Sequence, residues 1–459
     1  MWFGYFGWLP ALVPADARTF RVSDPMLAEL LRDAGGEIVE ETPDAEIADL
    51  EHIAGDAELA IVTIEPGYVE ESTLLASVAR RARRTISARV SARRASRRLN
   101  ELGYGETDVV LWDIDQFVHL PGGRPTGRRR PAELMPQRAL VVGRRGDPTT
   151  TLLEAVAQEF GGQVGSTVEY SQPLARQGLS LALAGEYVLR VAIGHGRRKI
   201  ELQEAALERL AAADPPPVLE QRVPKLLAKG RLGLGDWCVE ERLPGRIAPH
   251  ELDDELMEDC IDFLVALHGI GRGEPGPPLA ESAKTLAAAC TRKDHRERAL
   301  DLGHRLDAEL GHVPRGFSHG DFWTNNLLVV ENRLRGVIDW DASRPGRLPL
   351  LDLLHLQLSA RREKTREFLG VALVGRQLPW AEAGGDDIVD VYCRRIGIDV
   401  DGPLLTWFVL AYWIERIAFE LYLFPDRAQR PVWMRNNVEV VLDALGAQES
   451  SRPGTRLVS

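Results

Sequence analysis

Two short apolar runs separated by a polar turn constrain the fold of this chain more than any other feature. The runs are residues 327–330 and 334–338, and their spacing predicts a β-hairpin that turns at residues 332–333. In that register Asn326 lies opposite Asp339. Two oxygen-bearing side chains are therefore expected at the same end of one hairpin.

These residue types suit phosphoryl transfer. Transfer of a γ-phosphoryl group needs Mg²⁺ to neutralise the phosphates and a group that orients the attacking hydroxyl, and Mg²⁺ prefers hard oxygen ligands. Asp339 and Asn326 supply one carboxylate and one carbonyl oxygen for the ion. Asp321, in the loop before the hairpin, is the candidate base, and His319 is expected to brace that loop by hydrogen bonding. The pattern predicts a kinase.

The motif also resembles that of a known family, the aminoglycoside phosphotransferases and choline kinases, which are relatives of the protein kinases. It consists of His319-Gly-Asp321-x4-Asn326 and Ile338-Asp339-Trp340. The resemblance covers residues 160–445 and implies a two-lobed α+β fold, ATP or GTP as donor, Asp321 as catalytic base, and Asn326 with Asp339 as magnesium ligands. Asp352 matches the acidic residue that steadies the catalytic loop in this family.

The nucleotide-binding lobe of such a fold is expected before the motif. Residues 186–192 have the pattern of a buried strand, and residues 201–213 that of a helix whose apolar stripe is Leu202, Ala205, Ala206 and Leu210. Arg190 on the strand is the candidate cation for the phosphates, and Glu204 is the helical carboxylate that would hold it. An ordinary surface ion pair is the alternative. Arginine in place of lysine resembles the choline kinase branch.

The loop that should cover the phosphates has a weak pattern. Residues 170–180 include Gly178 and Ser180 but no G-x-G-x-x-G motif. These two residues are as consistent with an ordinary hairpin turn as with phosphate contacts. Residues 237–245 resemble the strand and hinge between the lobes, and Glu241 is accordingly a candidate nucleotide contact.

The residues before the kinase-like part alternate apolar strands with helical patterns, which predicts a smaller α/β domain. Strands are expected at 59–64, 108–115 and 138–143, and helices at 26–35 and 71–102. We expect domains at residues 1–150, 151–245 and 246–447, with a flexible tail at 448–459.

Three basic or glycine-containing segments of the N-terminal region leave alternatives open. The arginine-rich runs 80–98 and 124–130 are either solvated faces or docking surfaces for an acidic partner or a phosphorylated ligand. The strand-to-helix turn at 143–148 is either an ordinary turn or an anion site.

Composition limits the class of protein. The net charge of -12 argues against general nucleic-acid binding. The four cysteines have no C-x-x-C spacing, and this pattern favours reduced core cysteines in a cytoplasmic protein. No segment has the pattern of a signal peptide or a membrane span. The apolar stretch 404–424 carries charged residues, and its Arg416 and Glu420 are expected to form a surface ion pair.

The phosphoryl acceptor remains open at this stage. An amino sugar or aminoglycoside, a simple sugar and an amino alcohol all present a hydroxyl. The candidate residues for binding it are acidic: Asp341, Glu382, Asp386, Asp387, Glu415 and Glu420. Two further hypotheses stand beside the kinase: a non-catalytic, kinase-like nucleotide-binding scaffold that serves the N-terminal domain, and an N-terminal domain that is a separate transferase. The sequence carries no signal of oligomeric state.

Overall fold

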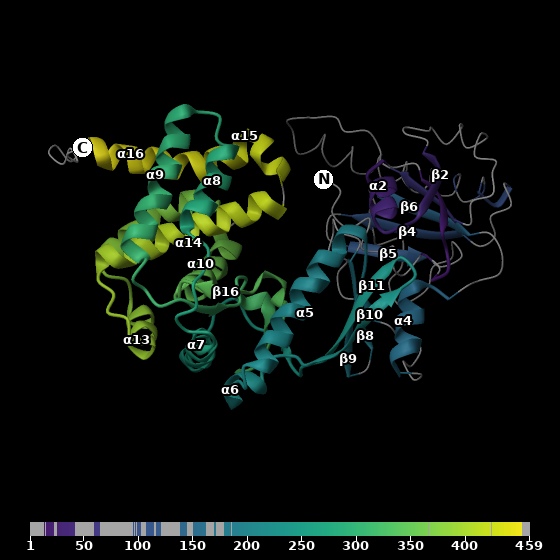
Figure 1. Ribbon diagram of the computed structural model, residues 1–459, viewed down its shortest axis with the longest axis horizontal. Coiled ribbons are helices and arrows are strands. Elements are labelled where there is room, and N and C mark those ends of the chain that lie inside the picture. Colours follow the sequence, from purple (N-terminus) through teal and green to yellow (C-terminus); the bar gives the residue numbers. More distant parts are fainter. Residues whose placement is uncertain are drawn as a thin grey trace. The chain divides into compact units, whose positions relative to one another are not determined.

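The computed structural model describes residues 13, 15–22, 25–41, 59–64, 95, 97, 99–101, 107–113, 116–120, 138–144, 150–161, 169–170, 179–184, 186–365, 367–423 and 425–451 (Figure 1). The chain divides into two compact units. Unit 1 consists of Met1–Glu201 and Leu226–Arg242, and unit 2 of Leu202–Lys225 and Leu243–Ser459. Sheets and helices are both present, which confirms the predicted α+β class.

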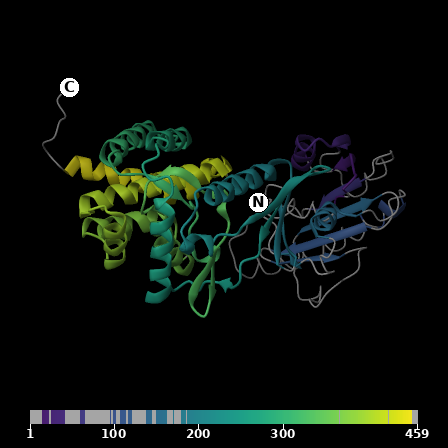
Figure 2. The same ribbon diagram turned by 60° about the horizontal axis from the view of Figure 1, so that its bottom comes forward.

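The N-terminal part of unit 1 contains a six-stranded sheet in the order β2-β1-β3-β6-β4-β5 (Figure 2). Its strands are β1 (Thr19–Val22), β2 (Glu37–Glu41), β3 (Leu59–Ile64), β4 (Thr107–Asp113), β5 (Gln116–Leu120) and β6 (Arg138–Arg144). Strand β1 pairs in parallel with β2 and β3, and the other pairs are antiparallel. The helices described here are α2 (Pro25–Asp33) and α4 (Leu152–Gly161).

These elements confirm the predicted strands at 59–64 and 138–143, the predicted strand at 108–115 as far as residue 113, and the predicted helix at 26–35. Residues 114 and 115 lie outside the described residues. Most of the predicted helix at 71–102 lies outside the described residues, although residues 95, 97 and 99–101 are helical. The basic run 124–130, most of the run 80–98 and the turn after residue 144 also lie outside them.

A second sheet of unit 1 is antiparallel throughout and has the order β10-β11-β9-β8-β7. Its strands are β7 (Glu169–Tyr170), β8 (Leu179–Ala184), β9 (Tyr187–Ile193), β10 (Leu226–Leu232) and β11 (Gly235–Glu241). Between β9 and β10 come α5 (Arg197–Ala212) and α6 (Pro217–Glu220). The strand predicted at 186–192 and the helix predicted at 201–213 are confirmed.

The apolar stripe predicted for α5 is partly wrong. Ala206 and Leu210 are buried, but Ala205 is exposed, and the buried face is completed by Leu207 and by Gln203, which is fully buried. The Gln203 side chain accepts a hydrogen bond from the backbone N–H of Trp340 (2.6 Å). Positions 203, 206, 207 and 210 share one side of a helix, so the buried face of α5 includes one polar side chain.

The two parts of unit 1 share one hydrophobic core. Alternate residues of β9 and β11, including Val191 and Trp237, pack with Phe20, Leu31 and Leu152 from the N-terminal part. Successive side chains of a strand point to opposite faces, and the other face carries Ala192 and Cys238, which pack with Ile200. One face of the five-stranded sheet is thus covered by the N-terminal residues.

We expect Phe20→Ala to lower the free energy of unfolding by about 3–5 kcal/mol, because the fully buried ring would leave a cavity in this shared core. Urea denaturation followed by tryptophan fluorescence measures the change. Leu227→Ala is the control, since Leu227 is 43% exposed on β10 of the same unit. An equal effect of both substitutions would contradict the assignment of Phe20 to the core.

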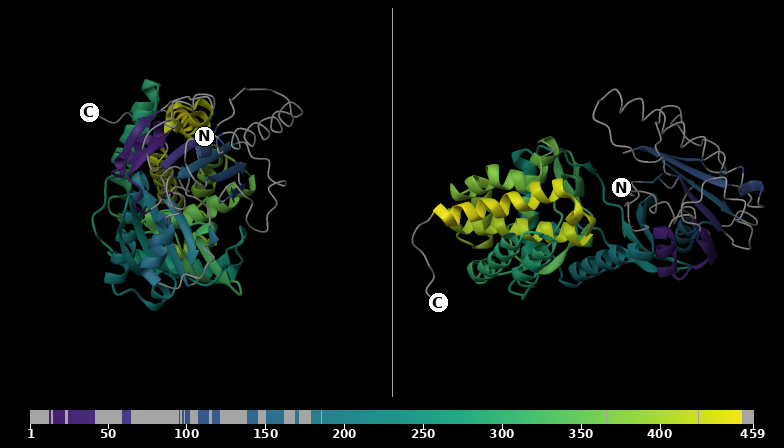
Figure 3. Two further views of the ribbon diagram at one scale, coloured as in Figure 1. Left: turned by 90° about the vertical axis from the view of Figure 1, so that its right-hand side faces the viewer. Right: turned by 90° about the horizontal axis from the view of Figure 1, so that it is seen from above.

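Unit 2 is mainly helical (Figure 3). The helices are α7 (Asp254–Gly269), α8 (Leu279–Ala289), α9 (Lys293–Leu310), α10 (Leu351–Thr365), α11 (Leu369–Ala372), α12 (Leu378–Glu382), α13 (Asp387–Ile396), α14 (Gly402–Leu423), α15 (Pro431–Met434) and α16 (Val440–Ser451). Helix α14 packs against α8, α9 and α10. The strands form two small sheets, β12 (Arg246–Ile247) with β14 (Leu327–Val330) and β15 (Arg333–Val337), and β13 (Gly316–Ser318) with β16 (Arg344–Arg347).

All four cysteines are free and buried, as the sequence predicted. Among the described residues, no helix has both the length and the apolar character that crossing a membrane requires. The domain boundaries predicted at residues 150, 245 and 447 remain predictions.

Candidate active site

The predicted hairpin is present, but its turn is one residue earlier than predicted. The turn residues are Glu331 and Asn332, and both have positive φ angles (48° and 61°). This left-handed pair is the conformation of a type I′ turn, which matches the twist of the two strands. The prediction of a turn at residues 332–333 was wrong because a glutamate gives no sequence signal for positive φ.

The corrected register still brings the two predicted metal ligands to one end of the hairpin. The earlier turn alone would place Asn326 opposite Val337, but a bulge between Leu328 and Val329 shifts the pairing by one residue. Asn326 therefore lies opposite Ile338 rather than opposite Asp339. The Ile338 N–H donates to the backbone oxygen of Asn326 (2.9 Å). Asp339 is the next residue and has a left-handed backbone (φ 68°).

The loop before the hairpin requires glycine at position 320. Gly320 has a φ of +78°, and a Cβ atom there would meet the backbone oxygen of Ala342. The buried carboxylate of Asp352 accepts the N–H groups of His319 and Gly320, both at 2.8 Å. These two bonds confirm that Asp352 steadies the loop.

We expect Asp352→Asn to lower the free energy of unfolding by about 1–3 kcal/mol, because the amide NH₂ replaces an acceptor and leaves a buried backbone N–H without a partner. Activity should fall as well, since the loop carries Asp321. Chemical denaturation and initial rates measure both effects. Asp390→Asn, at an exposed position of α13, should change neither; a stable and fully active Asp352→Asn protein would show that the loop does not depend on Asp352.

The His319 side chain forms hydrogen bonds through both ring nitrogens, as a residue that holds the loop in place would. It is fully buried, its Nε2 lies 3.1 Å from the backbone oxygen of Ile338, and its Nδ1 accepts the N–H of Asp321 (3.3 Å). These contacts assign the neutral tautomer with the proton on Nε2. Burial lowers the pKa of His319, against the opposing charges of Asp352, Asp321 and Asp339, so the ring stays neutral at physiological pH.

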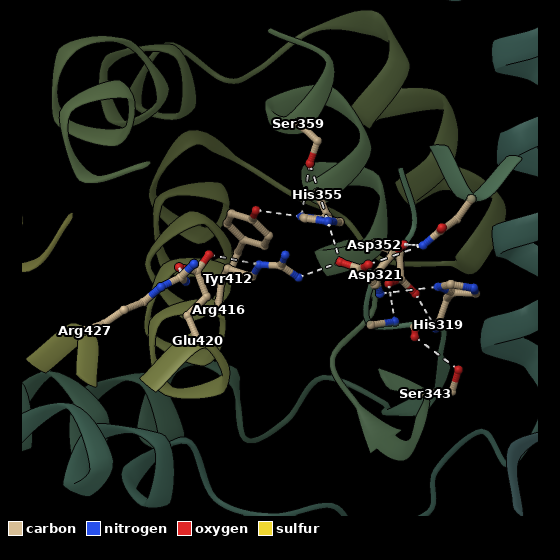
Figure 4. A network of polar contacts seen from close by, with 12 residues as sticks. His319, Asp321, Ser343, Asp352, His355, Ser359, Tyr412, Arg416, Glu420 and Arg427 are labelled. Atoms are coloured by element: carbon tan, nitrogen blue, oxygen red, sulfur yellow. Dashed lines mark hydrogen bonds and ion pairs between the residues drawn. The ribbon is translucent and has the colours of Figure 1, made fainter. Parts of the chain in front are cut away.

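The carboxylate of Asp321 is held by three side chains (Figure 4). Its Oδ1 accepts from Arg416 Nη1 (2.8 Å) and lies 3.2 Å from His355 Nε2, while its Oδ2 accepts from Asn326 Nδ2 (3.3 Å). Burial alone would raise the pKa of Asp321. The hydrogen bond from His355 and the charge of Arg416 outweigh burial and hold the pKa well below its usual range. Asp321 is therefore an ionised acceptor with a fixed orientation.

Arg416 was predicted to form a surface ion pair with Glu420, and its contact with Asp321 was not predicted. The predicted surface pair with Glu420 is loose (3.6 Å), and Arg416 instead reaches from α14 to Asp321, where its side chain is only 21% exposed. Glu420 also pairs with Arg427.

His355 on α10 was also missed. Its Nε2 donates to Asp321, and its Nδ1 accepts from the Tyr412 hydroxyl (2.8 Å). Burial, with the charge of Arg416, lowers the pKa of His355. Its position three residues after Asp352, on the same face of a helix, is the signal that would have found it.

Two clefts of unit 2 adjoin these residues, and both are lined by His355 and Arg416. The first, of about 350 Å³, includes Arg347 and Glu415 and is called the Arg347 cleft. The second, of about 420 Å³, includes Asp321 and Arg362 and is called the Arg362 cleft. The predicted base thus lines the Arg362 cleft directly.

The residues predicted to bind magnesium fit that ion. The Asn326 side chain uses its amide nitrogen to donate to Asp321 (backbone oxygen, 2.9 Å), so its carbonyl oxygen is the atom that would face a cation. With the Asp339 carboxylate, the pair offers two hard oxygen donors, and Mg²⁺ commonly completes its shell with phosphate and water. Among the described residues there is no cluster of three or more His, Cys, Asp or Glu that could hold a metal ion without such partners.

The predicted nucleotide residues of unit 1 are placed as follows. Arg190 on β9 is buried and forms an ion pair with Glu240 on β11, Nε to Oε1 at 2.8 Å. Glu240 was not predicted; Glu241, which was, is exposed at the end of β11. Ser180 lies in β8 opposite Val191, and Gly178 lies outside the described residues. In unit 2, Glu204 lies on α5, and its predicted role remains a prediction.

The acidic residues proposed for the acceptor are largely engaged elsewhere. Glu415 is buried and pairs with Arg347 (2.8 Å), and Glu420 pairs as described above. Asp386 caps α13 by accepting the N–H of Val389 (3.1 Å). Asp341 is buried after the hairpin, while Glu382 and Asp387 lie in α12 and α13.

Residues 179–385 match the model of the phosphotransferase enzyme family. The match begins at β8 and includes β9, the loop at His319–Asp321, the hairpin and Asp352. This match confirms the predicted family resemblance over these residues.

Individual proteins are similar to this chain over stretches of different length. Acyl-CoA dehydrogenase family member 11 of Rattus norvegicus is 30% identical over 146 residues, which are 29% of this chain and 18% of the rat protein; the matched region is thus under a fifth of that relative's length. An aminoglycoside phosphotransferase of Streptomyces rimosus, solved with ADP and streptomycin, is 17% identical, with 57% of this chain and 96% of that chain covered and a TM-score of 0.38. A thermostable aminoglycoside phosphotransferase mutant, solved with ADP and hygromycin B, is 18% identical, with 66% and 100% covered and a TM-score of 0.43. At these TM-scores the two solved structures add nothing to the assignment.

Proposed function

We propose that this protein transfers the γ-phosphoryl group of ATP, with GTP as a possible second donor, to a hydroxyl group of a small molecule in an Mg²⁺-dependent reaction. The observation that carries the proposal is the arrangement around Asp321. This ionised carboxylate lines a cleft, contacts Asn326 (3.3 Å), and precedes a hairpin that ends at Asp339. The phosphotransferase family match over the same residues supports it.

The roles follow from the chemistry of each group. Asp321 would orient the acceptor hydroxyl and take its proton, which a carboxylate of low pKa can do because proton transfer is late in a loose transition state. Asn326 and Asp339 would hold Mg²⁺, which neutralises charge on the phosphates when bound. His319 would brace the loop. Arg190, Glu204, Gly178, Ser180 and Glu241 are proposed for the nucleotide.

A cytoplasmic location is part of the proposal. The four buried free thiols support it, because cysteines stay reduced in that compartment.

The test is direct transfer of label. Purified protein is incubated with γ-labelled ATP and Mg²⁺ and with pooled sugars, polyols, hydroxy acids, amino sugars, aminoglycosides and amino alcohols. Label is expected on at least one acceptor with the wild type and not after chelation of Mg²⁺ with EDTA. Tight ATP binding with no transfer to any pool would reject the kinase and support the scaffold hypothesis.

A further inference from the structure

The chemistry of the Arg362 cleft restricts the kind of acceptor, and this inference rests on the function proposed above. The cleft adjoins Asp321, so an acceptor hydroxyl within reach of the base occupies it. Every carboxylate that lines it already has a basic partner: Asp321 has Arg416, Glu367 has Arg376, and Glu420 has Arg416 and Arg427. No carboxylate there is left to neutralise a cationic acceptor.

Arg362 in the same cleft is not paired in this way, and Arg416 and Trp323 each keep an N–H group without a hydrogen bond to any described residue. Arg362 donates from Nε to the backbone oxygen of Glu367 (3.1 Å), and no carboxylate of the described residues pairs with its guanidinium group. Arg416 contacts Asp321 through Nη1 (2.8 Å), and its buried Nε lies 3.6 Å from Glu420 Oε1 without forming a hydrogen bond. The indole N–H of Trp323 is also buried without an acceptor among the described residues.

The two arginines line the same cleft from different helices. Arg362 lies on α10 and Arg416 on α14, and both border the Arg362 cleft together with Asp321. Guanidinium groups bind carboxylate and phosphate oxygens through paired N–H donors.

We propose that the acceptor carries an anionic group near the hydroxyl that it presents to Asp321, and that Arg362 and Arg416 bind this group in the Arg362 cleft. A carboxylate or a phosphate monoester supplies the required oxygens. Arg416 then acts on both reactants, since it holds Asp321 through Nη1 and offers its remaining donors to the anion. The oxygen of the acceptor hydroxyl bonds to the γ-phosphorus, the bond from that phosphorus to the bridging oxygen of ADP breaks, and the hydroxyl proton passes to Asp321.

The experiment compares acceptors of different charge with γ-labelled ATP and Mg²⁺. The pools are hydroxy acids such as glycerate and malate, hydroxyl-bearing phosphate monoesters such as glycerol phosphate, neutral sugars and polyols, and aminoglycosides with amino alcohols. Label on one of the first two pools is the expected result, and the pool that is labelled distinguishes a carboxylate from a phosphate. Label confined to neutral or cationic acceptors would overturn this inference and leave the proposed kinase standing. No label in any pool would reject both.

Variants of the cleft give the second readout, measured with the acceptor that the wild type labels. Arg362→Gln is expected to raise KM for the acceptor at least tenfold, with kcat and KM for ATP nearly unchanged, and Arg362→Lys to restore part of the loss. Arg416→Gln should change both KM and kcat because it also contacts Asp321. Arg361→Gln is the matched control, since Arg361 is the exposed neighbour on the same helix. An unchanged KM for the acceptor in Arg362→Gln would overturn the inference.

Discussion

Replacing Asp321 with asparagine is expected to lower kcat by about 10²–10⁴-fold, the range measured for loss of a general base, while KM for ATP changes little. The amide keeps the shape of the side chain but cannot take the hydroxyl proton. It also presents an NH₂ group or a neutral oxygen to Arg416 and His355, so the orientation of residue 321 is weakened. Initial rates with a labelled acceptor measure the effect.

The pH dependence gives a second check on the same residue. Since the pKa of Asp321 is held well below its usual range, the base stays ionised throughout the neutral and mildly acidic range, and kcat/KM should show no acidic limb from Asp321 between pH 5 and 8 (about 3.9 is the ordinary aspartate pKa). The same depressed pKa means that ionised Asp321 stabilises the fold above that ordinary value and loses this contribution as the pH falls. An Asp321→Asn protein that folds normally and turns over at the wild-type rate would remove Asp321 from the mechanism.

Replacing Asp339 with alanine is expected to lower kcat by about 10³-fold or more at saturating ATP, because a bound metal supplies several kcal/mol of charge stabilisation in the transition state. Asn326→Ala should have a smaller effect, since it removes a neutral ligand. The Mg²⁺ concentration that gives half-maximal rate should rise in both variants, and a Mg²⁺ titration of the rate measures it.

The control variant for the metal site changes a residue at the other end of the same hairpin. Glu331→Gln changes an exposed turn residue and should leave both the rate and the Mg²⁺ dependence unchanged. If Asp339→Ala shifted the Mg²⁺ dependence no more than Glu331→Gln, the metal assignment would be wrong.

The parts of the site that follow one another in sequence could be predicted well. The loop at His319 and the hairpin depend on short segments whose residue types are typical of their conformation. The contact of Asp352 with the loop, 32 and 33 positions away, was implied by the family resemblance. The predicted turn was wrong by one residue because two non-glycine residues adopt positive φ, so that Val330 pairs with Arg333, and the bulge after Leu328 was not predicted. Local pattern cannot predict that choice, since the surrounding contacts decide it.

Residues that reach the site from distant elements could not be predicted in this way. Arg416 is 95 positions from Asp321 in the chain, and its neighbour Glu420 offered a simpler local partner. The strongly apolar surroundings of Arg416 on α14 were the available signal that its charge is enclosed and needs a buried partner. Glu240 was missed for a related reason: its partner Arg190 lies on the neighbouring strand, 50 positions away, and strand pairing is not visible in sequence spacing.

The shared core of unit 1 has a practical consequence for dissecting this protein. A fragment that begins near residue 150 would strip Phe20 and Leu31 from the β9 and β11 face, and Val191 and Trp237 would meet water. Large uncovered apolar faces promote aggregation. Domain truncation is therefore expected to yield insoluble material, and point substitutions in the intact polypeptide are the sounder route to separating what each region contributes.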